Sequence, residues 1–109
     1  MNTNAKHTPG PWTAASQDAE TNEIPIKSGK SILARVAPRP HWDATQESNA
    51  RLIAAAPDLL YALKEAKLML ETAKAYFPKS IKNRDRFSLL NVLANAVDPA
   101  IAKAEGGAQ

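Results

Sequence analysis

The residues best suited to binding chemistry gather in one stretch of the chain, between positions 35 and 51. They combine arginines, a histidine, a tryptophan and an asparagine: Arg35, Arg39, His41, Trp42, Asn49 and Arg51. Guanidinium groups can hold a phosphate through paired hydrogen bonds, an indole ring can stack on a base, and an amide can both donate to and accept from a base edge. The set predicts a site for a nucleotide-like ligand, such as a cyclic or other signalling nucleotide.

These residues also have an ordinary structural explanation. Trp42 can fill the core, and Asn49 can cap the first turn of a helix. Arginine side chains on a surface are commonly solvated, with their stems lying along apolar groups. The sequence leaves both interpretations open.

Catalytic and metal-binding groups are scarce in the sequence, which contains two histidines, His7 and His41, and no cysteine. A metal site needs several such ligands, and a hydroxyl or thiol nucleophile needs a positioned base. The segment Ser28-Gly29-Lys30-Ser31 ends like a phosphate-binding loop but lacks the first glycine of that motif, so it predicts a hairpin turn instead. We therefore expect no metal, no cofactor and no enzymatic activity.

The overall charge is mildly basic, with 14 basic and 11 acidic side chains among 109 residues and a formal net charge of +3. The densest basic cluster is Lys79, Lys82, Arg84 and Arg86, which Asp85 interrupts. Such a cluster favours a solvated loop between helices over a nucleic-acid patch. The apolar runs are far shorter than the roughly 18 residues that span a bilayer. DNA and membranes are therefore not expected partners.

The first third of the chain alternates apolar and polar residues, which is the signature of β-strands. The alternating apolar positions are Trp12, Ala14, Ile24, Ile26, Ile32, Ala34 and Val36. They predict an antiparallel sheet of two or three strands after an extended arm over residues 1–10. Trp12 is expected to anchor the core, with ligand stacking as the alternative. Because Pro25 has no backbone N–H, its strand is expected at an edge of the sheet, or to be short.

From residue 46 the pattern becomes helical. A first helix is expected to run to Ala56 and a second from Pro57 to Tyr76, with one kinked helix as the alternative. A third helix is expected after Asn83 or Asp85, with Pro99 able to bend it and Gly106-Gly107 ending it. The buried stripe of the second helix is predicted as Leu59, Leu60, Leu63, Ala66, Leu70, Ala73 and Phe77. The expected fold is thus α+β, with a small N-terminal sheet followed by a hairpin of two or three helices. It is expected to form one domain over residues 11–106, followed by a tail at residues 107–109.

The second helix carries more apolar residues than one buried stripe requires. Leu60, Leu68 and Met69 are predicted to form an interface between copies of the chain, most simply in a two-fold dimer.

Two blocks of the sequence resemble a family of small proteins encoded by tailed bacteriophages and prophages. Residues 7–12 read HTPGPW, and residues 49–63 match the pattern NARLIAAAPxLLxAL. The resemblance implies an accessory phage gene and no particular chemistry. Together with the absence of cysteine, it predicts a protein of the bacterial host cytoplasm.

The expected plan of a small sheet with helices is similar, at the level of fold alone, to that of the anti-defence nucleotide sponges. Three functions follow in order of preference. The first is non-enzymatic sequestration of a nucleotide-derived immune signal. The second is protein–protein inhibition of a bacterial antiviral effector, comparable to an anti-CRISPR protein, with a host defence protein as the partner. The third is a regulatory or structural role in the phage.

Overall fold

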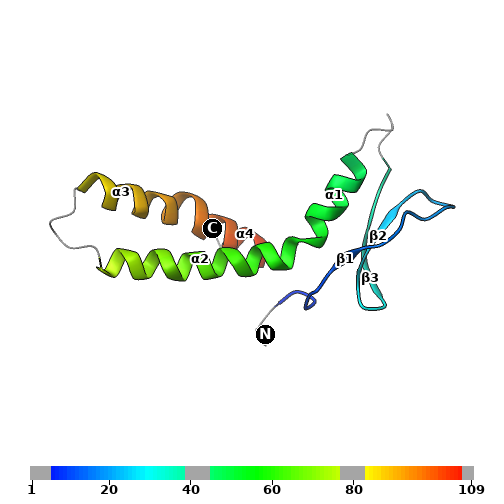
Figure 1. The fold of residues 1–109 in the computed structure, drawn as a ribbon, viewed down its shortest axis with the longest axis horizontal. Helices are drawn as coiled ribbons and strands as arrows, with labels where there is room; N and C mark the ends of the chain where they lie inside the picture. Colours follow the sequence, from blue (N-terminus) through cyan, green and yellow to red (C-terminus); the bar gives the residue numbers. More distant parts are fainter. Residues whose placement is uncertain (1–5, 39–44, 77–82, 107–109) are drawn as a thin grey trace. The chain divides into compact units, whose positions relative to one another are not determined.

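The computed structural model describes residues 6–38, 45–76 and 83–106 of the chain. In chain order the elements are β1 (Thr13–Ala14), β2 (Ile24–Ser28), β3 (Ser31–Val36), α1 (Thr45–Ala54), α2 (Ala56–Tyr76), α3 (Asn83–Val92), the π-helical turn η1 (Leu93–Val97) and α4 (Asp98–Glu105) (Figure 1). The predicted α+β class, with helices after an N-terminal sheet, is confirmed. The chain divides into two compact units, residues 1–59 and 60–109. Residues 1–5 of the predicted arm and the predicted tail lie outside the described residues.

The sheet of the first unit is antiparallel, with strand order β1-β2-β3. Ser28 pairs with Ser31, so Gly29 and Lys30 form the two-residue turn that the sequence predicted. Gly29 has φ = 59°, a left-handed conformation that glycine adopts without steric strain. The glycine therefore sets the geometry of this hairpin.

The predicted edge position of the strand containing Pro25 is wrong, because β2 is the central strand and Pro25 is buried. The Pro25 carbonyl accepts a hydrogen bond of 2.9 Å from the Ala15 backbone N–H. The nitrogen and carbonyl of one strand residue face the same neighbouring strand, so the missing N–H of Pro25 also faces the side of β1. Because the Pro25 nitrogen faces β1, its missing N–H interrupts no hydrogen bond between β2 and β3. On the other side, strand β1 already ends at Ala14.

The core of the first unit lies between the sheet and α1. Ile24, Ile26 and Ala50 are buried in one cluster, and Trp12 packs against it. The Trp12 indole N–H donates to the Thr8 carbonyl at 2.9 Å, which satisfies its polar atom at the edge of the core. The prediction that Trp12 anchors the core is confirmed.

The two sequence blocks meet within this unit. The His7 ring stands edge-on to the Trp12 ring, with 6.1 Å between the ring centres. Gly10 lies beside Pro57, since a Cβ added to Gly10 would stand 3.5 Å from the Pro57 Cγ. The Ser28 hydroxyl donates to the Pro9 carbonyl at 3.0 Å. Residues 7–12 are therefore held against the sheet and the start of α2.

Helices α1 and α2 are separate, with Ala55 between them. Pro57 is the second residue of α2, where a backbone N–H would have no partner inside the helix. The Ala55 N–H still donates to the Arg51 carbonyl, and the Leu59 N–H donates to the Ala55 carbonyl, both at 2.9 Å. The second helix begins one residue before the predicted Pro57, and the first helix ends at Ala54, two residues before the predicted Ala56.

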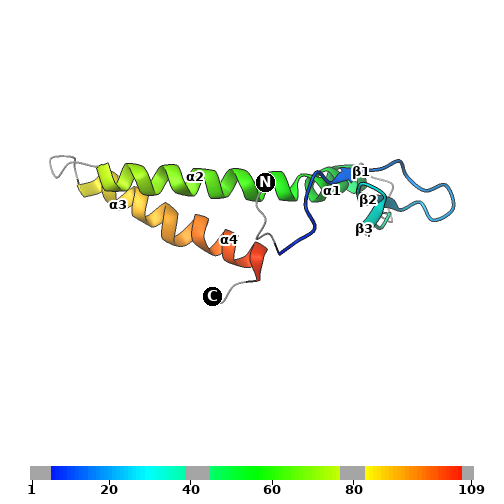
Figure 2. The same ribbon diagram turned by 90° about the horizontal axis from the view of Figure 1, so that it is seen from below.

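In the second unit α3, η1 and α4 run back along α2 (Figures 1 and 2). Pro99 stands in the first turn of α4, directly after the π-helical turn, in which the Asp98 N–H donates to the Leu93 carbonyl. In a continuous α-helix the Pro99 ring would meet the carbonyl four residues earlier. The wider turn accommodates the proline, and Gly106, at φ = 71°, ends α4 as predicted.

The predicted buried stripe of α2 is correct only in part. Leu60, Leu63 and Leu70 are half-buried, but Leu59, Ala66 and Ala73 are exposed, and Phe77 lies outside the described residues. The half-buried side also includes Lys64 and Lys67, which pair with acidic residues of α4. The face that meets α4 is thus rotated from the predicted one.

Candidate functional site

The candidate ligand residues do not gather at one place among the described residues. Arg35 is exposed on β3, and Asn49 and Arg51 are exposed on α1. Arg39, His41 and Trp42 lie outside the described residues. Of the candidates that the structure describes, Arg51 alone lines the cavity between the sheet and α1.

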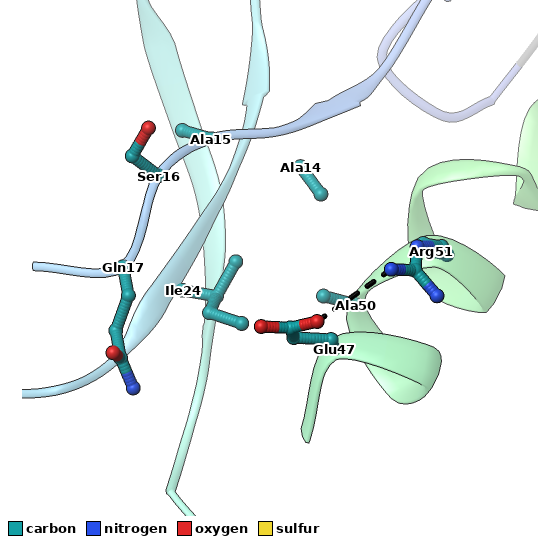
Figure 3. A pocket seen from close by; sticks show the side chains of 8 residues that line it. All are labelled: Ala14, Ala15, Ser16, Gln17, Ile24, Glu47, Ala50 and Arg51. Carbon is teal, nitrogen blue, oxygen red and sulfur yellow. Dashed lines mark ion pairs between the residues drawn. The ribbon is translucent and has the colours of Figure 1, made fainter. Parts of the chain in front are cut away.

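That cavity is open and has a volume of about 220 Å³. Figure 3 shows its walls, which come from the end of β1, the following loop, β2 and α1. Half of the lining side chains are small; the full set is Ala14, Ala15, Ser16, Gln17, Ile24, Glu47, Ala50 and Arg51. Ligand pockets usually enclose about 300–1,000 Å³, so this cavity is small for a nucleotide.

The two charged groups of the cavity pair with each other. Arg51 Nη2 lies 3.5 Å from Glu47 Oε2, one helical turn away on α1, and both side chains are largely exposed (Figure 3). The Glu47 carboxylate partly neutralises the guanidinium and would repel a phosphate at the same position. An exposed pair of this kind adds little stability.

Arg35 acts on a different group, Asp18. The pKa of Asp18 is lowered, first by hydrogen bonds from the backbone N–H groups of Glu20 and Thr21 and more weakly by the Arg35 charge. Those two N–H groups lie 2.8 and 3.1 Å from Asp18 Oδ1. The ionised carboxylate therefore organises the loop between β1 and β2.

The residue that positions α1 is Gln46, which no local pattern in the sequence marks. Its amide is buried and donates to the Asn22 carbonyl at 2.7 Å and to the Val36 carbonyl at 3.1 Å. The Gln17 amide donates to Gln46 Oε1 at 3.1 Å. These bonds tie the first turn of α1 to the β1–β2 loop and to the end of β3.

The first unit also exposes large apolar side chains around the α1–α2 junction. Leu52 is 63% exposed, Leu59 is 53% exposed and Ile53 is 38% exposed. We call Leu52, Ile53 and Leu59 the junction surface. Polar and charged residues of α1, including Asn49 and Arg51, stand beside it in the sequence. A group of exposed apolar residues with polar neighbours is typical of a surface that binds another protein.

The described residues contain no group of three or more His, Cys, Asp or Glu side chains that could hold a metal ion. No helix in the described ranges is long and apolar enough to cross a membrane.

Comparison with known proteins identifies the family of the chain. Neither the search of curated proteins nor the search of solved structures gives a match. A family model described as Salmonella phage P22 protein Y8K6 matches residues 1–108. The chain therefore belongs to this bacteriophage protein family.

Proposed function

We propose that this protein is a non-enzymatic bacteriophage accessory protein that binds a protein of the bacterial host cytoplasm through its junction surface. A host defence effector is the partner class that best fits a phage accessory gene. The observation that carries the proposal is the exposure of Leu52, Ile53 and Leu59 within eight positions of the chain.

The chemistry of the junction surface supports a protein partner. Isolated exposed leucines are common, but here three large apolar residues close in sequence at one helix junction are each at least 38% exposed. The network around Gln46 holds α1 rigidly against the sheet, so the surface is formed before a partner arrives. A preformed surface lowers the entropy lost on binding.

Sequestration of a nucleotide is less well supported by the same geometry. The cavity beside Arg51 is small, and the Glu47 carboxylate, 3.5 Å from the Arg51 guanidinium, would repel a phosphate there. Arg35 interacts with Asp18, and the Arg35 side chain does not line the cavity. Among the described residues, the arginines therefore do not form the converging set that a nucleotide site needs.

Photo-crosslinking tests the proposal directly. A photoreactive residue at position 52 should capture one host protein reproducibly in infected cells, and the same residue at Ser31, which is exposed in the β2–β3 hairpin, should not. The captured protein would then be purified and its binding to the phage protein measured. Equal capture from both positions would contradict the proposal.

A second experiment tests the nucleotide alternative. The purified protein is incubated with a panel of cyclic and linear nucleotides and examined by native mass spectrometry. A nucleotide retained at fixed stoichiometry would overturn the protein-binding proposal in favour of sequestration. The proposal predicts that no nucleotide is retained.

A further inference from the structure

The outer side of β1 is an open edge of the sheet. Among the described residues β1 pairs with β2 alone, through Thr13 and Ala14. The Ala15 N–H donates to the Pro25 carbonyl, so Ala15 faces β2, and in an extended chain the neighbouring Ala14 faces the opposite way. The N–H and the carbonyl of Ala14 therefore both point toward the open edge. We call this side of Thr13–Ala15 the β1 edge.

The other edge of the sheet, formed by β3, is protected against pairing. The register between β2 and β3 shifts at Ile26 and Lys27, and an irregularity of this kind twists an edge strand away from a new partner. Strand β3 also carries the charged and exposed Arg35. The β1 edge has neither feature, since Thr13–Ala15 contains no charge. A partner strand is therefore expected at β1.

The cavity described above lies beside the β1 edge, between the sheet and α1 (Figure 3). Ile24 and Ala50, which are 4% and 1% exposed, give it an apolar floor. Glu47 and Arg51, whose side chains are largely exposed, stand at its rim. A cavity of about 150 Å³ is enough to hold a benzene ring. The volume of about 220 Å³ is therefore sufficient for one large side chain.

The rim of the cavity favours an uncharged side chain. The Glu47 carboxylate repels an anion, the Arg51 guanidinium repels a cation, and the two opposite charges lie only 3.5 Å apart. A charged side chain would thus meet a like charge wherever it entered. An apolar side chain avoids this repulsion and gains free energy from the apolar floor.

We propose that the β1 edge and this cavity bind an extended segment of a partner protein, which adds to the sheet as a fourth strand antiparallel to β1. One residue of the segment exchanges two hydrogen bonds with the Ala14 backbone. Its side chain points to the same face of the sheet as Ala14 and the cross-strand neighbour Ile26. Ile26 belongs to one buried cluster with Ala50 of α1, so this face is the one that α1 covers.

The arrangement combines two kinds of recognition. The main chain of the segment supplies hydrogen bonds to the β1 edge whatever its sequence is, and the cavity selects the side chain opposite Ala14. The segment is thus defined by its chemistry: an extended backbone with an uncharged, apolar residue at that one position.

This surface is separate from the other two that concern binding. No residue of the junction surface lines the cavity, so either proposal can fail while the other holds. The oligomer interface predicted from the sequence belongs to the second unit. There Leu68 and Met69 are 57% and 70% exposed and Leu60 is half-buried, and their role in self-association stays a prediction.

Selection from a library of short random peptides provides the probe for the β1 edge. Selected peptides should bind the full-length protein with a dissociation constant of about 1 mM or tighter. They should share one apolar position that tolerates neither a positive nor a negative charge. A library that yields no such peptide, or peptides that require a charge at that position, would overturn the proposal.

Hydrogen exchange measured by NMR locates the bound peptide. The outward Ala14 amide should exchange at least about tenfold more slowly in the saturated complex, because it then donates to the peptide. The Arg35 amide, which faces outward from β3 by the same ladder rule, should keep its rate. An unchanged rate at Ala14, or equal slowing at both amides, would contradict binding at the β1 edge.

Two pairs of variants separate the edge from the cavity. Ala14→Pro removes the outward N–H without removing a hydrogen bond between β1 and β2, and it should raise the dissociation constant at least about tenfold. Arg35→Pro makes the same change at the β3 edge and should not. Ser16→Leu, which fills the cavity, should also weaken binding, whereas Ser48→Leu, exposed on α1 outside the cavity, should not.

Circular dichroism shows whether each variant keeps the fold. Wild-type affinity in folded Ala14→Pro or in folded Ser16→Leu would overturn the proposal. Because Ser16 is exposed, Ser16→Leu keeps the test decisive if the proline variant does not fold.

Discussion

The Gln46 side-chain amide donates to the backbone carbonyls of both Asn22 and Val36, at 2.7 and 3.1 Å. One buried side chain thus joins the start of α1 to a loop and to the last residue of β3. The two carbonyls lie 24 and 10 positions away from Gln46 in the sequence. This contact determines where α1 sits on the sheet, and it therefore determines how the junction surface is presented.

Replacing Gln46 by Ala should lower the free energy of unfolding by about 2 kcal/mol, because the Val36 carbonyl loses a buried hydrogen-bond donor and the side-chain amide is removed. The measurement is urea denaturation followed by circular dichroism. Ser48→Ala, an exposed position on the same helix, is the control and should change the value by less than about 0.5 kcal/mol. Equal effects of the two substitutions would contradict a structural role for Gln46.

The turn at Gly29 gives a prediction about backbone conformation. Gly29→Ala should lower the free energy of unfolding by about 1 kcal/mol, because alanine is strained at φ = 59°. No atom lies within 4 Å of an added Cβ, so the loss should come from the backbone alone. Gly29→Asn should lose less, since asparagine tolerates this conformation better. If alanine and asparagine destabilise equally, the strain argument is wrong.

Asp18 is predicted to stabilise the fold at neutral pH and to lose this effect in acid. Its pKa is lowered in the folded protein by the hydrogen bonds from Glu20 and Thr21, so its ionised form stabilises the fold. This stabilisation is present above the ordinary value of 3.8 and is lost as the pH falls through the lowered pKa. The melting temperature of Asp18→Ala should therefore be below that of wild type at neutral pH. The difference should shrink in strong acid, and a difference independent of pH would contradict the assignment.

Lys67 is predicted to lose its stabilising effect at high pH, whereas Asp18 loses its effect at low pH. The hydrogen bond from Lys67 to Asp98 raises the pKa of Lys67 above 10.5, and the charges of Asp98 and Glu71 add to this effect. The stabilisation is complete below 10.5 and is lost as the pH rises through the raised pKa. Lys67→Met should melt at a lower temperature than wild type at neutral pH, with a difference that narrows in strong base. A constant difference would show that Lys67 acts through packing alone.

Local signals in the sequence predicted most of the fold. The alternation around Ile24 and Ile26 marked the sheet, Gly29 marked its turn, and Pro57 and Gly106 marked helix ends. Each of these signals acts within a few residues, because it reflects backbone conformation or the period of one element. The membership in a bacteriophage family, expected from two short blocks, also agrees with the match over residues 1–108.

Contacts between distant segments could not be predicted in the same way. The strand position of Pro25 depends on which neighbour its missing N–H faces, and that follows from the pairing with Ala15. The rotation of α2 depends on the side where α4 binds, because the helix has apolar residues on several sides. The role of Gln46 depends on two carbonyls that no local pattern connects to it. For the candidate site, the sequence grouped arginines that the fold separates: the Arg35 charge lowers the pKa of Asp18, whereas Arg51 pairs with Glu47.

The most direct test of the proposed function is the affinity of the host protein that crosslinks at position 52. Its dissociation constant should be measured by calorimetry with wild type, Leu52→Asp and Ser31→Asp, which add the same charge at two exposed positions. We predict that Leu52→Asp weakens binding at least about tenfold and that Ser31→Asp leaves it unchanged. Binding that is equally strong for all three proteins would contradict the junction surface as the site of action.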